Sequence, residues 1–163
     1  MSLYFLDASA LVKYYILEPG STWLRTIVDL PDNEVVISDA SLAECAAAFA
    51  ILGRTGRIHR ALQQRAFRSL SQHIAANFID ALPVATADFQ KAAALTQIYP
   101  LKAYDAVQLA VAVRHQHSLS MFGLSMAFVS SDKTLLNSAL AEGLMIDNPF
   151  DHVLPQDTPG RSP

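Results

Sequence analysis

The stretch Leu3–Tyr15 constrains the fold most, because it places an acid between a buried strand and a helix. The apolar run Leu3–Leu6 is short and unbroken, which is typical of a strand buried on both faces of a sheet. Asp7 follows at once, and apolar residues then recur at helical spacing up to Tyr15. A buried strand that leads directly into a helix indicates an open α/β sheet, in which ligands bind beyond the carboxyl ends of the strands.

The rest of the chain continues this alternation of strands and helices. The further strands that the pattern predicts are Glu34–Ile37, Phe78–Val84, Met126–Val129 and Leu144–Ile146. The further helices are Trp23–Leu30 with Ser21 as its cap, Leu42–Leu52 ended by Gly53, Ile58–Ala76, a helix from its cap Thr86 to Tyr99, Leu101–His117, and Asp132–Ala141 ended by Gly143. We therefore predict an α/β domain with a mainly parallel central sheet of about five strands and helices on both faces.

The length of 163 residues favours one domain, which we place at residues 1–150. Residues 151–163 contain Pro155, Pro159 and Pro163 without any periodicity, so we expect a flexible C-terminal tail. Hydrophobic residues make up 52% of the chain, which is ample for a buried core.

Charged residues are scarce, at 17% against roughly 25% in an ordinary domain. The formal net charge of −3 argues against binding nucleic acid by bulk attraction, so a local basic patch or bound cations would have to supply it. Cys45 is the single cysteine, which excludes an internal disulfide. No signal-peptide pattern and no apolar run of about 20 residues is present, and we expect a cytoplasmic protein.

Two acids follow predicted strands, and each has an ordinary structural interpretation. Asp7 could simply cap the helix after it, a role worth roughly 1 kcal/mol. Asp132 follows Met126–Val129 at the start of a helix, where a negative charge is favourable in any case. Taken alone, both residues would be interpreted as structural.

Glu44 also has a structural interpretation that the local sequence favours. Ser41 and Glu44 have the spacing of a capping box, in which the two side chains satisfy backbone N–H groups at a helix start. If the helix instead begins at Ser38 or Asp39, Glu44 lies in the second turn and points sideways.

Asp105 is harder to explain structurally, because its predicted helix is apolar on most sides. A helix that begins just after Pro100 would place Asp105 too far in to be the cap. Pairing with Lys102 would contribute only tenths of a kcal/mol on a helix surface. Since a buried, unpaired carboxylate is costly, a positive group should face Asp105.

Four segments together resemble the PIN-domain nucleases, and in particular the VapC-type toxins of bacterial toxin–antitoxin pairs. They are Leu6-Asp7-Ala8-Ser9-Ala10-Leu11-Val12-Lys13, Glu44 in its helix, Tyr104-Asp105-Ala106-Val107-Gln108-Leu109-Ala110, and Val129-Ser130-Ser131-Asp132. The likeness extends from about Leu3 to Ile146. Each motif is common by itself, whereas four acids in this order and setting are far more specific.

The resemblance implies a metal-dependent endoribonuclease in which Asp7, Glu44, Asp105 and Asp132 converge on Mg²⁺ or Mn²⁺. Asp7 and Asp105 would be the main ligands, Glu44 would be a ligand or orient the attacking water, and Asp132 would hold a second, weaker ion. Such cations prefer oxygen ligands, which carboxylates supply. The family also implies an RNA substrate, a cognate antitoxin and a homodimer.

Other interpretations remain open. A non-catalytic PIN-fold module that binds RNA or protein is the main alternative, although four intact acids argue against it. A related phosphatase would need a second acid two residues after Asp7, where Ser9 stands. The five arginines from Arg54 to Arg68 could bind RNA phosphates, face solvent or meet an antitoxin. The apolar segment Leu119–Phe122 could support a dimer or fold back on the core.

Overall fold

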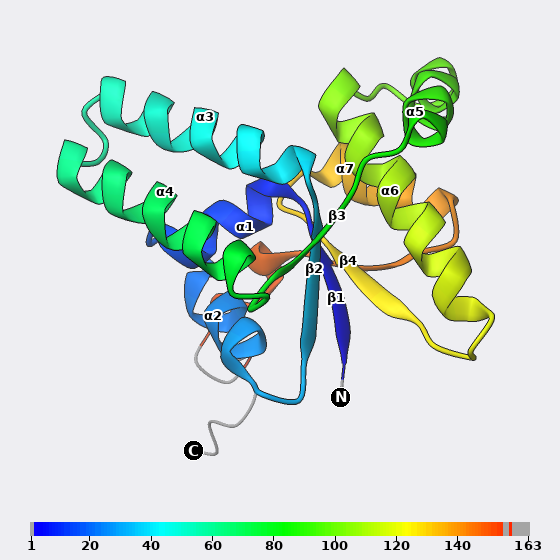
Figure 1. Ribbon diagram of the computed structural model, residues 1–163, viewed down its shortest axis with the longest axis horizontal. Helices are drawn as coiled ribbons and strands as arrows, with labels where there is room; N and C mark the ends of the chain where they lie inside the picture. Colours follow the sequence, from blue (N-terminus) through cyan, green and yellow to red (C-terminus); the bar gives the residue numbers. More distant parts are fainter. Residues whose placement is uncertain (1, 155–156, 158–163) are drawn as a thin grey trace.

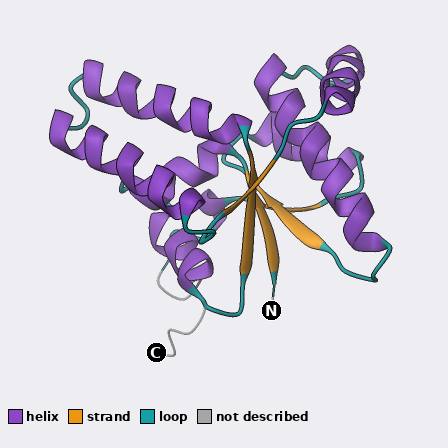
Figure 2. Ribbon diagram, viewed as in Figure 1, coloured by secondary structure: helices purple, strands orange, loops and turns teal. Residues whose placement is uncertain are grey.

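Figure 1 shows the fold, a computed structural model in which residues 2–154 and 157 are described. The predicted flexibility of the C-terminal tail therefore concerns residues that lie mostly outside the described part. A central sheet is covered by helices on both faces, as Figure 2 shows by element type.

Five strands form one sheet in which every neighbouring pair is parallel. They are β1 (Leu3–Leu6), β2 (Glu34–Ser38), β3 (Asp80–Leu82), β4 (Met126–Val129) and β5 (Met145–Asp147). Their order is β3-β2-β1-β4-β5. Strands β2 and β3 therefore lie on one side of β1, and β4 and β5 lie on its other side. The predicted α/β fold with a parallel five-stranded sheet is confirmed. The switch point between β1 and β4 is where open α/β sheets bind ligands.

The helices divide between the two faces of the sheet (Figure 1). One face carries α1 (Ala8–Tyr15), α2 (Ser21–Asp29), α3 (Ala40–Arg54) and α4 (Arg60–Ala75), and the other carries α5 (Thr86–Ile98), α6 (Ala103–Ser120) and α7 (Lys133–Ala141). A short 3₁₀ turn, η1 (Pro149–Asp151), follows β5 and packs on α2. Among the described residues, no helix combines the length and the apolar character needed to cross a membrane.

Strand β1 contributes to both cores, because successive side chains of a strand point to opposite faces. Leu6 packs in the core under α1 to α4, together with Phe49 of α3. Phe5 faces the other core and stacks on Phe128 of β4, with ring centroids 5.5 Å apart. This double burial explains why the first strand is an unbroken apolar run.

Several helix boundaries differ from the sequence prediction by a few residues. Ser21 is the first residue of α2 rather than its cap, and Gly20 holds the cap position with φ +86°. Gly53 does not end α3, which continues to Arg54. Its missing side chain instead leaves room for Gln63 of α4, whose amide lies where a Cβ would stand.

The long connection before β4 is mostly helical. α6 continues to Ser120, and a short turn with Gly123 leads into β4. Leu119 packs against the core, while Met121 and Phe122 are 72% and 77% exposed. The apolar segment therefore contributes one residue to the core and two to the surface.

Gly20→Ala should destabilise the fold strongly. A side chain at φ +86° is strained, and its Cβ would lie 2.3 Å from the carbonyl oxygen of Pro149. We expect a loss of roughly 3 kcal/mol in the free energy of unfolding, measured by urea denaturation. Gly123→Ala is the matched control, because φ is +69° but the surrounding space is open, so it should lose only about 1 kcal/mol. Equal losses for both variants would contradict the close packing of Gly20 on Pro149.

Candidate active site

Asp7 lies at the junction between β1 and α1, where its side chain is 4% exposed. One carboxylate oxygen accepts hydrogen bonds from the backbone N–H of Ala10, at 2.9 Å, and from Ser9 Oγ, at 2.8 Å. Asp7 is therefore the N-cap of α1, which confirms the structural interpretation. The cap uses one of its oxygens, so the other remains available to a ligand.

The β1–α1 turn is joined to the turn that follows β4. Asp7 donates its backbone N–H to the carbonyl oxygen of Val129, at 3.1 Å. The backbone N–H of Ser131 donates to Ser9 Oγ at 2.9 Å, and the hydroxyls of Ser9 and Ser130 are 3.3 Å apart. These bonds fix two strand ends at the switch point of the sheet.

Asp132 is fixed in the same way as Asp7. Its side chain accepts from the backbone N–H groups of Thr134 and Leu135 at 2.7 and 3.1 Å, which makes it the N-cap of α7. Its own backbone N–H donates to Ser130 Oγ at 3.0 Å. The sequence pattern predicted the cap at Asp7, whereas it placed Asp132 inside the first turn of its helix; the structure makes Asp132 the cap, one residue before α7 begins. The two caps follow the neighbouring strands β1 and β4.

The capping-box interpretation of Glu44 is wrong. Helix α3 begins at Ala40, so Ser41 already lies inside the first turn and Glu44 in the second. Ser41 Oγ is hydrogen bonded to the amide of Gln108 instead of a backbone N–H of its own helix. An acid in the second turn has no free backbone N–H to bind, and Glu44 points sideways toward α6.

Gln108 of α6 holds Glu44, and the sequence analysis assigned it no role. Its Nε2 donates to Glu44 Oε2 and to Ser41 Oγ, and its Oε1 accepts from Ser38 Oγ at 2.9 Å. Gln108 is 1% exposed and lies three residues after Asp105. The signal available in the sequence was an amide within the otherwise apolar part of this helix, because a buried amide requires polar partners.

Asp105 lies in the first turn of α6, which begins at Ala103 rather than at Leu101. Burial raises the pKa of this half-buried carboxyl, the Asp132 charge raises it further, and Lys102 only partly offsets them. Within the described residues, Asp105 forms no ion pair with Lys102 or any other basic side chain. The positive group that the sequence analysis expected is therefore not a side chain of this part of the chain.

The four acids are electrostatic neighbours. Burial raises the pKa of Glu44, and the Asp105 charge raises it further against the hydrogen bond from Gln108. Burial and then the charges of Asp7 and Glu44 raise the pKa of the Cys45 thiol between them. Together with the effect of Asp132 on Asp105, these influences relate Asp132 to Asp105, Asp105 to Glu44, and both Glu44 and Asp7 to Cys45.

The donor set fits a divalent cation, but it is not a closed ligand cage. Within the described residues, no three acidic, histidine or cysteine side chains are gathered closely enough to hold a metal. Mg²⁺ commonly uses one or two carboxylates and retains several waters, so a closed cage is not required. Asp7 is buried and Glu44, Asp105 and Asp132 are partly buried, and none of them forms an ion pair with a basic side chain of the described residues. Such carboxylates supply the oxygen ligands and negative charge that a divalent ion needs.

A cleft of about 490 Å³ lies beside this group of acids, and Ser9, Glu44 and Ser131 form part of its wall. Lys13 also lines the cleft, but its Nζ is paired with Glu18 Oε2 at 3.0 Å and lies 4.1 Å from the centre of the Phe150 ring. The charge of Lys13 is therefore already neutralised.

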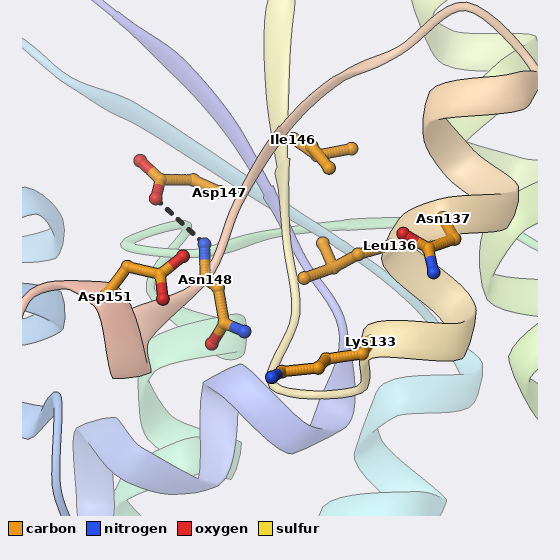
Figure 3. A pocket seen from close by; sticks show the side chains of 7 residues that line it. All are labelled: Lys133, Leu136, Asn137, Ile146, Asp147, Asn148 and Asp151. Atoms are coloured by element: carbon orange, nitrogen blue, oxygen red, sulfur yellow. Dashed lines mark hydrogen bonds between the residues drawn. The ribbon is translucent and has the colours of Figure 1, made fainter.

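Figure 3 shows a separate hollow of about 320 Å³ between α7 and the segment after β5. It is lined by Lys133, Leu136, Asn137, Ile146, Asp147, Asn148 and Asp151. Asp147 Oδ1 is occupied by the backbone N–H of Asn148, at 2.8 Å, and by His152 Nε2, at 2.6 Å. None of the four candidate acids lines this hollow, so we place the candidate active site at the switch point instead.

Asp7 should make the metal-free protein less stable as the pH rises. Burial raises its pKa from 3.8 to about 6, although hydrogen bonds from Ala10, Ser9 and Ser130 lower it. The folded chain thus binds the proton more tightly than the unfolded chain. The stability that Asp7 contributes is fully present below its unfolded pKa of 3.8, and about 3 kcal/mol is lost as the pH rises through about 6.

Asp7→Asn keeps a capping oxygen but cannot ionise. In EDTA, we expect the variant to match the wild type near pH 4 and to exceed its free energy of unfolding by about 3 kcal/mol at pH 7. Urea unfolding at a series of pH values measures this difference. Parallel pH profiles for the two proteins would contradict a raised pKa for Asp7.

Comparisons with known proteins show the family and the fold of the chain. The model of the PIN domain family matches residues 4–135. Among solved structures, a chain of VapBC2 from Rickettsia felis bound to a DNA fragment from their promoter is 12% identical, with a TM-score of 0.61 and coverage of 90% of this chain and 98% of that one. A chain of FitAcB from Neisseria gonorrhoeae is 17% identical, with a TM-score of 0.55 and the same coverages. No curated protein sequence matches the chain. Because the family model covers most of its length, the chain belongs to the PIN domain family.

Proposed function

We propose that this chain is a metal-dependent endoribonuclease that hydrolyses RNA phosphodiester bonds, and that it is the toxin of a type II toxin–antitoxin pair. PIN domains are generally nucleases, which supports a hydrolase acting on phosphodiester bonds. The observation that carries the proposal is the absence of an ion pair, among the described residues, between a basic side chain and any of Asp7, Glu44, Asp105 and Asp132. Two of these acids, Asp7 and Asp132, follow the carboxyl ends of the neighbouring strands β1 and β4.

The proposed metal is Mg²⁺ or Mn²⁺. Asp7 and Asp105 would be its main ligands, Asp132 would hold a second, weaker ion, and Glu44 would be a ligand or orient the attacking water. When bound, such an ion polarises the phosphate and stabilises the charge that develops on the leaving oxygen.

The chain's own residues contribute positioning and proton transfer. Ser9 and the Ala10 N–H fix one oxygen of Asp7, so the carboxylate does not have to reorient during a reaction. Gln108 fixes one oxygen of Glu44 in the same way. Because burial raises the pKa of Glu44, its carboxylate is a stronger base than an exposed glutamate and can accept a proton from water.

The proposal includes protein partners. Two solved structures of similar fold are those of VapBC2 and FitAcB, and the first of them holds a promoter DNA fragment. We infer that this chain likewise binds a small cognate antitoxin that blocks its active site, and that it acts in the cytoplasm. The similar fold at low identity supports this inference, together with the VapC-type motifs around the four acids.

Asp105→Asn separates a metal site from a structural role. In EDTA, the variant should unfold at a higher temperature, because the ionised carboxyl is disfavoured in the folded protein. Each kcal/mol corresponds to roughly 2–4 °C in a domain of this size. With Mn²⁺, cleavage of total RNA should fall by roughly 100-fold or more, since a main ligand is lost. Thermal unfolding beside an RNA cleavage assay gives both results.

Asp32→Asn is the control for Asp105→Asn, because Asp32 is an exposed acid in the turn before β2. It should leave both the midpoint and the cleavage rate unchanged. A lower midpoint for Asp105→Asn in EDTA, with cleavage intact, would return Asp105 to a structural role. RNA binding by the wild type without any cleavage in Mg²⁺ or Mn²⁺ would favour the non-catalytic PIN-fold module instead.

We also propose that the chain forms a homodimer, in which the exposed Met121 and Phe122 are buried. Two large apolar side chains that are 72% and 77% exposed at one turn are suited to an interface. Light scattering at micromolar concentration should give the mass of a dimer, and replacing both residues by serine should weaken it by at least tenfold, or about 1.4 kcal/mol. A monomer mass for the wild type would refute the dimer.

A further inference from the structure

The charges of this chain are separated along its sequence. Between Glu44 and Asp80 there is no acidic residue, whereas five arginines fall in this stretch. Since the whole chain has a formal charge of −3, this stretch carries +5 and the remainder carries −8. Such a separation creates a strong local field even though the net charge is small.

The fold places these arginines on one projecting part of the molecule, the hairpin formed by α3 and α4 (Figure 1). All five are exposed, and no acidic side chain of the described residues forms an ion pair with them. They are Arg54, Arg57, Arg60, Arg65 and Arg68. Helix α3 also carries Glu44 of the candidate site, and the ten residues from Glu44 to Arg54 extend about 15 Å.

The outer face of α4 combines charge with an aromatic ring. Helical spacing places Arg60, Gln64, Phe67 and Arg68 on one side, opposite Ala66, which is buried. Gln64, Phe67 and Arg68 line a shallow hollow of about 470 Å³, with Ser71 beside them. Phe67 is 45% exposed, which leaves its ring accessible from the solvent.

We infer that this outer face of α4 binds single-stranded RNA outside the catalytic site. Arg60 and Arg68 contact backbone phosphates, and a base stacks on Phe67 in the hollow. Arginines interspersed with an exposed aromatic ring are the combination by which proteins hold single strands without reading their sequence. The identity of the ligand as RNA rests on the proposed function.

Electrostatics favours a polyanion over a protein partner as the occupant. The body of the molecule carries −8 and repels RNA, so an attractive surface away from the four acids is needed to retain the strand. A long RNA can contact the hairpin and the catalytic site together, whereas a dinucleotide bound at the catalytic site has no further nucleotides with which to contact the hairpin. The inference therefore predicts a contribution that depends on RNA length.

The test compares two double variants with the same net charge. Arg60→Gln/Arg68→Gln removes the proposed phosphate contacts, and Arg54→Gln/Arg65→Gln removes two exposed arginines of the same hairpin that lie off this face. Binding of a labelled single-stranded RNA of about 16 nucleotides is measured in EDTA, where the strand stays intact, at several salt concentrations. We expect Arg60→Gln/Arg68→Gln to bind the RNA at least tenfold more weakly. The slope of log affinity against log salt concentration should become shallower by about 1.4, since two phosphate contacts are lost. Both changes should be much smaller for Arg54→Gln/Arg65→Gln.

Phe67→Leu tests the stacking contact, because it keeps an apolar side chain of similar reach. We expect roughly fivefold or more weaker binding with an unchanged salt slope. Circular dichroism should show that Phe67→Leu and the two double variants are folded. Each of them should cleave a dinucleotide substrate in Mn²⁺ at the wild-type rate.

If Arg60→Gln/Arg68→Gln binds RNA with unchanged affinity and an unchanged salt slope, the inference is wrong. If the same variant has also lost antitoxin binding, this face of α4 binds a protein instead. An equal loss in the two double variants would also overturn the inference, since the attraction would then be diffuse. A wild type that binds RNA through this face but cleaves neither substrate would refute the proposed nuclease while leaving the inference standing.

Discussion

The hydrogen bonds around Asp7 are the interaction on which the rest of the site depends. Asp7 directly follows β1 and caps α1, and its backbone N–H donates to the carbonyl oxygen of Val129. Ser9 connects the same turn to Ser131, because its Oγ accepts from the backbone N–H of Ser131. These bonds hold the neighbouring strands β1 and β4 together at their carboxyl ends. The strand order β3-β2-β1-β4-β5 changes direction between these two strands. The carboxylate is buried and forms no ion pair within the described part of the chain, and the same bonds also set the position of this acid, whose pKa is raised by burial.

The burial of acids in the candidate site lowers the stability of the folded, metal-free protein. Burial raises the pKa values of Asp7, Glu44 and Asp105, so ionising them near neutral pH costs folding free energy. The carboxylate of Asp88 differs from that of Asp7: both residues are buried, but Arg114 contacts both oxygens of Asp88, at 2.8 and 3.0 Å. The contrast supports a role for the four acids that requires an external cation.

The candidate acids and the exposed arginines lie on different parts of the fold. Two of the candidate acids, Asp7 and Asp132, follow the carboxyl ends of neighbouring strands, while five exposed arginines lie on or between α3 and α4. Helix α3 carries both Glu44 and Arg54. A protein that must bring a polyanion to an acidic pocket benefits from this separation, because attraction at a distance does not neutralise the carboxylates. The neutral pairing of Lys13 with Glu18 beside the cleft fits the same division.

The sequence by itself determined the architecture and the positions of the acids, because buried strands, helix caps and turn residues leave local patterns. Leu3–Leu6 and Met126–Val129 have the predicted bounds, and Asp7 and Asp132 cap the predicted helices. The capping box at Glu44 was wrong, since local spacing does not reveal where α3 begins. Only the tertiary structure paired Glu44 with Gln108, 64 residues away, and left Asp105 without an ion pair to any basic side chain of the described residues. Such contacts depend on how helices pack across the sheet, and no local pattern records that packing.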